Sequence, residues 1–340
     1  MNTKISALYL YDVHQPKFLI ARFSSIGDIV MTAPVVQALR AHYGDKAQID
    51  FITLAKFKGA AELISAIDTI YTVEKSTAEI SSALQKNGYD YLIDLHSNVR
   101  SRSLARALNI MTFKVNKLGA ARLSLVLGMR KKPVEHFIER SLNLLSPFSI
   151  SQPTSNPWGT INCTAPSTTL PSNYIVLAPG AAHHGKELPE STLEAICTKV
   201  DSHFVIVGGP DMQPLGSSLA SKFPKKVTSL CGLSTLSETA FVLRNASLTI
   251  GGDTGAMHIA TAVNTPLISV WGCTRPSLGL YPWQPHPNSI ILEPNDRGHR
   301  PCSRHGARCR HKKFGKDLCI TTVTPESIID AINTITQTAL

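Results

Sequence analysis

The 340-residue chain predicts an α/β protein built from two parallel-sheet halves, and three features of the sequence indicate this. Short apolar runs that end in glycine or polar turns and lead into helical segments repeat through both halves, as in doubly wound parallel sheets. A Ser/Thr/Pro/Asn-rich stretch without periodicity separates the halves. The length also suits two domains of ordinary size. We therefore expect an N-terminal domain at 1–150, a linker at 151–172 and a C-terminal domain at 173–340.

The first half predicts a series of strand–helix units. Its first strand is the apolar run Lys17–Arg22, which is typical of a buried parallel strand. The helix that follows the next turn reaches Ala41, and Pro34 requires it to begin late or to kink. Further strands are expected at Gln48–Thr53, Thr69–Val73 and Tyr89–Leu95, with helices at Lys58–Ala66 and Thr77–Gln85.

The second half repeats the pattern. Strands are expected at Tyr174–Ala178, His203–Val207 and Pro266–Val270, and helices at Pro189–Lys199, Leu236–Arg244 and Pro325–Thr336. Nearly every strand of this half ends in glycine or polar residues. Because ligands of open α/β sheets bind at the carboxyl ends of the strands, one edge of the predicted sheet is suited to a ligand.

The stretch Asn245–Ala260 is the most informative of these turns, since a short strand breaks at Gly251 and Gly252 and then opens a helix of small residues. Free N–H groups and the positive end of a helix dipole suit a diphosphate. Asp253 and Thr254 add oxygens for ribose or sugar hydroxyls, and His258 falls one turn further on the same face. A plain helix cap at Asp253 or Thr254 is the alternative interpretation.

Phe23–Asp28 forms a similar turn after the first strand. It places the carboxylate of Asp28 at the start of a helix. Taken alone, this position is more typical of a plain helix N-cap.

The net charge of +10 is concentrated in two runs without acidic residues. The first basic run (residues 95–134) contains Arg100, Arg102, Arg106, Lys114, Lys117, Arg122, Arg130, Lys131 and Lys132. The second basic run (residues 297–316) contains Arg297, Arg300, Arg304, Arg308, Arg310, Lys312, Lys313 and Lys316. Such runs attract anionic partners: phosphorylated substrates, anionic lipid or nucleic acid. A solvated basic face is the alternative.

Seven cysteines without a secretory signal indicate a reducing, cytosolic compartment. The apolar runs have the length of strands, far below the roughly 20 residues of a membrane-spanning helix.

The order of these motifs resembles glycosyltransferase family 9, the ADP-heptose:lipopolysaccharide heptosyltransferases. The resemblance rests on Phe23–Asp28, on Pro179–Gly180 with Lys186 and Pro189, and on Gly251–Gly255 with His258; Val207–Gly209 and Cys231–Leu233 also recur in place. It covers roughly residues 17–335. It implies the GT-B fold, in which two Rossmann-like domains with parallel sheets face each other across a cleft. It also implies inverting transfer of a heptose from an ADP-sugar to the lipopolysaccharide inner core, without a cofactor and without a metal for the chemistry.

The resemblance also implies roles for residues. Asp28 matches the general base, and Lys186 the lysine that steadies the departing diphosphate. Donor binding is expected from Gly180, Gly209, Asp253, Thr254, Gly255 and His258. Across the cleft, acceptor binding is expected from Ser25, Gly27, His96, Arg100 and Arg102. Leu188 stands where the family often has tryptophan, which leaves the identity of the sugar open.

The expected partners are an ADP-sugar, an anionic inner-core acceptor and the anionic inner face of the inner membrane. Nucleic acid is not expected, since no reader helix or stacking motif accompanies the charge. Three alternatives remain: a family member that uses another nucleotide-sugar, a catalytically silent relative that binds sugar-nucleotides, and a nucleic-acid-binding protein, which the charge alone would suit.

Cys302, Cys309 and Cys319 raise the question of a structural zinc site. Thiolates suit zinc, but the spacing matches neither a paired Cys-x-x-Cys knuckle nor a zinc finger. The remaining cysteines, Cys163, Cys197, Cys231 and Cys273, are interpreted as buried thiols.

Overall fold

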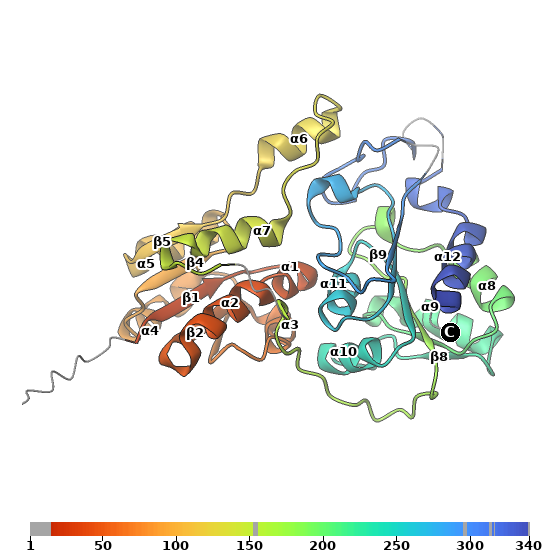
Figure 1. Ribbon diagram of the computed structural model, residues 1–340, viewed down its shortest axis with the longest axis horizontal. Helices are drawn as coiled ribbons and strands as arrows, with labels where there is room; N and C mark the ends of the chain where they lie inside the picture. Colours follow the sequence, from red (N-terminus) through yellow and green to blue (C-terminus); the bar gives the residue numbers. More distant parts are fainter. Residues whose placement is uncertain (1–14, 152–155, 295–297, 313–314, 316, 339–340) are drawn as a thin grey trace, which may run out of the picture.

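The computed structural model describes residues 15–151, 156–294, 298–312, 315 and 317–338. In this part of the chain, two parallel sheets lie side by side, each with helices packed around it (Figure 1). Residues 152–155 of the expected linker, and Arg297, Lys313 and Lys316 of the second basic run, lie outside the described residues.

The first sheet has five parallel strands in the order β3-β2-β1-β4-β5. These are β1 (Lys17–Ala21), β2 (Gln48–Leu54), β3 (Ile70–Val73), β4 (Tyr91–Asp94) and β5 (Met111–Lys114). The helices are α1 (Ile26–Val30), α2 (Ala33–Tyr43), α3 (Lys58–Glu62), α4 (Ser81–Lys86), α5 (Val99–Leu108), α6 (Gly119–Leu127) and α7 (Phe137–Leu142).

The second sheet has six parallel strands in the order β11-β10-β9-β6-β7-β8. These are β6 (Ile175–Ala178), β7 (Phe204–Ile206), β8 (Val227–Ser229), β9 (Leu248–Gly252), β10 (Leu267–Val270) and β11 (Ile290–Leu292). The helices are α8 (Glu190–Lys199), α9 (Gln213–Lys222), α10 (Leu236–Arg244), α11 (Gly255–Ala262) and α12 (Pro325–Thr338).

Both sheets have the strand order of doubly wound nucleotide-binding folds. The order of strands reverses between β1 and β4 in the first sheet and between β6 and β9 in the second. The strands at these two switch points are apolar and buried on both faces, as the runs in the sequence predict. The predicted α/β class with two parallel sheets is therefore confirmed.

Pro34 has the effect that the sequence predicts. One short helix, α1, ends at Val30, and α2 begins at Ala33 with Pro34 in its first turn, where the missing N–H costs no hydrogen bond. The helix predicted at Thr77–Gln85 is instead a 3-10 turn at Thr77–Glu79 followed by α4. Strand β5 and helices α6 and α7 were not placed by the sequence analysis.

Helices α1 and α11 pack against each other where the two halves meet (Figure 1). A Cβ atom on Gly27 would lie 2.5 Å from His258 Cδ2 and 3.3 Å from Gly255 Cα, and one on Gly255 would lie 2.8 Å from Ile26 Cγ2. Both positions therefore require glycine because of the close approach of the two helices.

A second connection joins the halves above this contact. The Val134 N–H donates to Ser277 O at 3.0 Å, the Phe137 N–H donates to Gly279 O at 2.9 Å, and Arg300 Nε donates to Val126 O at 2.7 Å. Leu125 and Val134 pack on Leu278 in a small apolar cluster. Helix α6 is thereby held against the second half of the chain.

Candidate active site

A cleft of about 870 Å³ lies between the carboxyl ends of the two sheets. Its walls come from the turns that follow β1 and β4 on one side and β6, β7 and β9 on the other. Both topological switch points therefore open into the same space, which is where ligands of such sheets bind. The predicted site residues that line the cleft are Ser25, Gly27, Asp28, His96, Gly180, Lys186, Gly209, Asp253, Thr254, Gly255 and His258.

Asp28 lies in the first turn of α1 and is held by three donors on one oxygen. Arg22 Nη2 lies 2.8 Å from Asp28 Oδ2, and the N–H and hydroxyl of Ser25 donate to the same oxygen at 3.1 and 3.0 Å. The carboxylate is 26% exposed. Asp28 is therefore not the helix N-cap. It occupies the third helical position and accepts from Ser25, which is the N-cap residue.

These contacts keep Asp28 charged. Burial opposes the charged form, but the Arg22 guanidinium and the Ser25 donors outweigh it and hold the pKa of Asp28 well below its usual range. Arg22 is itself 8% exposed and fixed, because its Nε donates to Ser24 O at 2.8 Å and its Nη1 donates to Leu95 O. The carboxylate has a defined orientation as a result.

His96 stands beside this pair on the turn after β4. The buried carboxylate of Asp94 accepts from the N–H groups of His96 and Ser97 at 3.0 and 2.7 Å and from the Ser101 hydroxyl at 2.7 Å, which shapes the turn. The Phe23 N–H donates to His96 Nδ1 at 3.3 Å, so the ring proton is assigned to Nε2. Burial and the charge of Arg22 lower the pKa of His96 to about 3, and the ring is neutral near pH 7.

Lys186 and Asp253 face each other on the opposite wall. Lys186 Nζ lies 2.7 Å from Asp253 Oδ2, and the two side chains are 16% and 6% exposed. Lys186 belongs to a 3-10 turn, η5 (His184–Lys186), whereas Asp253 directly follows β9. The sequence analysis treated them as separate donor contacts, but the structure makes them one ion pair.

The N-terminus of α11 presents unsatisfied polar groups beside this pair. Thr254 occupies the N-cap position, but its side chain makes no capping hydrogen bond. Its Oγ1 and the Nδ1 of His258, which is 4% exposed, are buried and lack a hydrogen-bond partner among the described residues. Buried polar atoms of this kind are suited to a polar ligand.

Several cations also line the cleft that were not selected from the sequence as site residues: Arg22, Lys117, Arg122, Arg140 and Arg304. Arg122, on α6, is the most informative, since its buried Nε and Nη2 lack a partner within the described part of the chain. Arg122 and Lys117 belong to the first basic run and Arg304 to the second. The absence of acidic residues from these runs was therefore the sequence feature that pointed to them. It did not show which basic residues of each run face the cleft.

Arg100 and Arg102 lie on α5 and are not among the residues lining the cleft. Arg100 Nε donates to Lys75 O at 3.1 Å, and its guanidinium lies 5.3 Å from the centre of the Phe23 ring. Arg102 is exposed and its Nε donates to Asn98 O at 3.3 Å. Leu188 is buried in the core of the second half, away from the cleft.

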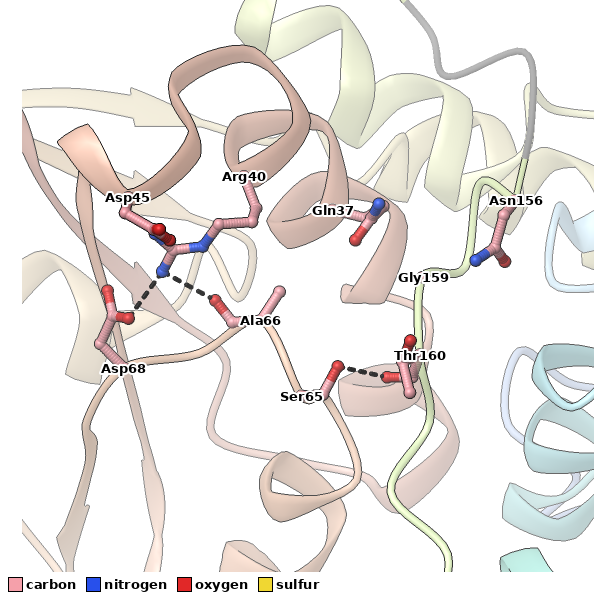
Figure 2. Close-up of a pocket in the computed structure, with 9 residues that line it drawn as sticks. All are labelled: Gln37, Arg40, Asp45, Ser65, Ala66, Asp68, Asn156, Gly159 and Thr160. Carbon is pink, nitrogen blue, oxygen red and sulfur yellow. Dashed lines mark hydrogen bonds and ion pairs between the residues drawn. The ribbon is translucent and has the colours of Figure 1, made fainter.

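A smaller hollow of about 370 Å³ lies near Arg40 in the first half (Figure 2). Arg40 Nη2 donates to Asp68 Oδ1 at 2.7 Å and to Ala66 O at 3.2 Å. The Ser65 hydroxyl donates to Thr160 O at 2.8 Å. Because these groups already satisfy one another, this hollow is a weaker candidate than the cleft.

The cysteines of the second half are arranged differently from the prediction. Cys273 is buried, as expected, but its sulfur lies with those of Cys302, Cys309 and Cys319, all four within 4.8 Å of one another. The sequence interpretation of Cys273 as an isolated buried thiol missed this cluster, because Cys273 follows β10 and is distant along the chain from the other three.

Comparison with known proteins identifies the family. The sequence profile of "Glycosyltransferase family 9 (heptosyltransferase)" matches residues 77–313. The chain belongs to glycosyltransferase family 9. The matched range includes His96, Lys186 and the whole turn after β9, and thus most of the second wall of the cleft.

Relatives of this glycosyltransferase agree with the assignment. Lipopolysaccharide heptosyltransferase 3 of Escherichia coli is 26% identical over 302 residues, which cover 78% of this chain and 85% of the relative. A family 9 glycosyltransferase from Veillonella parvula has a similar structure, with a TM-score of 0.73, 17% identity and 95% and 98% of the two chains covered. The E. coli ADP-heptose lps heptosyltransferase II matches with a TM-score of 0.71 and 16% identity over 95% of this chain and 100% of that one. The GT-B fold is thereby confirmed. Among the described residues of this glycosyltransferase, no helix is long and apolar enough to cross a bilayer.

Proposed function

We propose that this chain is an inverting glycosyltransferase that moves a heptose from ADP-heptose to the inner core of lipopolysaccharide. Family membership and the names of the relatives support the substrate class. The structural observation that carries the proposal is that Asp28 from the first half and the Lys186–Asp253 pair from the second line one cleft.

Asp28 is proposed as the general base. The acceptor hydroxyl attacks the anomeric carbon from the side opposite the diphosphate, and its proton passes to the carboxylate as the new C–O bond forms. Arg22 and Ser25 occupy Oδ2, while no described residue donates a hydrogen bond to Oδ1. That oxygen is the one expected to receive the proton. The low pKa ensures that the base is ionised, at the cost of intrinsic basicity.

Lys186 is proposed to stabilise the ADP leaving group, which takes the electron pair of the broken glycosidic bond. Gly255 and Ala256, at the start of α11, also line the cleft, where the N–H groups of a helix N-terminus are suited to a diphosphate. Asp253 would hold the ammonium in place. Gly180, Gly209, Thr254, Gly255 and His258 complete the proposed donor site. Lys186 and the N-terminal end of α11 would supply the positive charge that the diphosphate needs.

The acceptor is proposed to approach along the first wall, past Ser25, Gly27 and His96, with Arg100 and Arg102 as outer contacts. Arg122 supports an anionic acceptor, because its buried Nε and Nη2 lack a partner among the described residues and are suited to a phosphate or carboxylate. The end of α6 supports contact with the anionic cytoplasmic face of the inner membrane. There, the exposed side chains of Leu123, Leu127 and Met129 precede Arg130, Lys131 and Lys132.

The test is a calorimetric titration with ADP-, GDP- and UDP-sugars, followed by turnover on a truncated lipopolysaccharide acceptor. Tight binding of the ADP-sugar and a product that contains one additional heptose are expected. Preference for another nucleotide would reassign the donor. Binding without transfer to any acceptor would indicate a silent relative, and salt-dependent binding of nucleic acid without sugar-nucleotide binding would contradict the proposal.

A further inference from the structure

Four cysteines from three separate places in the sequence meet beside the second sheet. Cys273 follows β10, Cys302 and Cys309 lie on the long segment after β11, and Cys319 begins a 3-10 helix, η10 (Cys319–Thr322). Their sulfur atoms all lie within 4.8 Å of one another. Cys273 and Cys319 are buried, and Cys302 and Cys309 are half-buried.

The distances between the sulfurs match a tetrahedral metal site. Cys302 Sγ lies 3.5 Å from Cys319 Sγ, and Cys309 Sγ lies 3.7 Å from the same atom. Four thiolates at a zinc–sulfur distance of about 2.3 Å place neighbouring sulfurs about 3.8 Å apart. A disulfide requires a separation of about 2.05 Å.

The charge around the cluster also suits a metal thiolate. A divalent cation bound by four thiolates has a net charge of −2. The second basic run, which contains no acidic residue, includes Cys302 and Cys309 and offsets that charge.

The backbone around the cluster connects it to the cleft. The Cys302 N–H donates to Cys273 O at 2.8 Å, and the Cys273 N–H donates to Gly185 O at 3.0 Å, next to Lys186. A Cβ atom on Gly306 would lie 2.8 Å from Lys186 Cγ, so the segment between Cys302 and Cys309 packs directly on the lysine stem. Arg304 and His305 of this segment line the cleft.

We propose that Cys273, Cys302, Cys309 and Cys319 form a tetrathiolate site for a thiophilic metal cation, zinc or iron. The ion is held away from the reacting atoms, and it fixes the turn of Lys186 against the segment that carries Arg304 and His305. Binding replaces the protons of the thiols by the metal, so protons are released to solvent as the four metal–sulfur bonds form.

The first test is the metal content of the wild-type protein, purified under reducing conditions without chelators and without a metal-binding tag. We expect about one zinc or iron per chain. Elemental mass spectrometry of the purified protein identifies the bound metal as zinc or iron. After chelation, titration with cobalt is expected to produce the visible bands of tetrahedral thiolate coordination. A protein that holds neither metal and takes up no cobalt, or that forms a disulfide among these four residues, would overturn the proposal.

The second test compares single variants. Cys302→Ser and Cys319→Ser are expected to lose the bound metal and to melt at a lower temperature, whereas the matched control Cys163→Ser, outside the cluster, keeps both. If the control and the cluster variants have the same metal content, the four cysteines are not the ligands. Metal content is measured without any sugar substrate, so this result does not depend on the proposed transferase activity.

Discussion

At the scale of residues, the orientation and charge of Asp28 depend on Arg22. The guanidinium contacts Oδ2 at 2.8 Å and outweighs the effect of burial on the carboxylate. A carboxylate with a pKa far below that of an ordinary aspartate stays ionised at all but strongly acidic pH. The wild-type enzyme should therefore show no loss of activity from protonation of Asp28 above about pH 4.

Arg22→Gln tests this dependence. The variant removes the Coulombic attraction but leaves the burial, so the pKa of Asp28 should rise and an acid limb should enter the pH profile of kcat. The lowered pKa of Asp28 also contributes to the free energy of unfolding. A depressed pKa stabilises the fold above the unfolded value of about 3.9 and loses this effect as pH falls through the folded value. The variant should lose this contribution at neutral pH.

The matched control is Arg40→Gln, which breaks a similar pair with Asp68 outside the cleft. It should leave the pH profile of kcat unchanged. Identical profiles for Arg22→Gln and the wild type would show that Arg22 does not set the ionisation of the base.

The Lys186–Asp253 pair predicts coupled effects in a double-mutant cycle. Because both groups are largely buried and lie 2.7 Å apart, removal of either one leaves the other without its partner. Lys186→Met and Asp253→Asn should each weaken ADP binding and lower kcat, and the double variant should be little worse than Lys186→Met alone. Calorimetry and steady-state kinetics measure the coupling, expected at about 1–3 kcal/mol. If the effects of the two single variants add up in the double variant, Lys186 and Asp253 act independently and the prediction of coupling is wrong.

The sequence, through its strand-end turns and its family resemblance, was sufficient to bring Asp28, Lys186, Asp253 and His258 forward as candidates, and all four line the cleft. It was not sufficient to select Arg22 or Arg122. Arg22 was the last residue of a predicted strand, and only the fold turns its guanidinium back onto Asp28. Likewise, Cys273 joins the other cysteines only through the packing of β10 against the segment after β11.

At the scale of elements, the contact between α1 and α11 brings the two walls together. Gly27→Ala places a methyl group 2.5 Å from a ring carbon of His258 and close to the backbone of α11, so something must shift. We expect a loss of about 1–3 kcal/mol in unfolding free energy and a marked fall in kcat. Denaturant unfolding and kinetics measure both.

Gly59→Ala on α3 provides the matched control. Its Cβ would meet Leu236 of α10 at 3.7 Å, an ordinary contact across the same junction, so stability should stay level or rise by up to about 1 kcal/mol. If Gly27→Ala is as mild as Gly59→Ala, close packing of α1 on α11 is not needed.

Elements with apolar periodicity were predicted well, including α10, whose bounds agree with Leu236–Arg244. The region after β4 was not. Strand β5 is partly exposed along its length and α6 has only one buried residue, so neither carries a strong apolar pattern. Contacts with the far half of the chain hold α6 in place, and a local pattern does not contain this information.

At the scale of the whole molecule, the basic runs converge on the cleft from both halves. Arg122 faces the cleft, whereas Arg102 lies outside it. Loss of a hydrogen bond to a charged group costs about 1.5–3 kcal/mol, so Arg122→Ala should raise the acceptor KM roughly 10- to 100-fold. Added salt should weaken binding of the acceptor to the wild type and to Arg122→Ala. A smaller effect is expected for Arg102→Ala, and an effect equal to or larger than that of Arg122→Ala would place the acceptor on α5 instead.

The proposed role of Asp28 is to take the acceptor proton in a cleft that binds ADP-heptose. Its most direct test measures heptose transfer to the truncated acceptor by the wild type and by Asp28→Asn, alongside the ADP dissociation constant of each. Asparagine keeps the size of the side chain but cannot take the proton. We expect a fall in kcat of about 10²–10⁴-fold with nearly unchanged ADP affinity. Near-normal turnover by Asp28→Asn would contradict it.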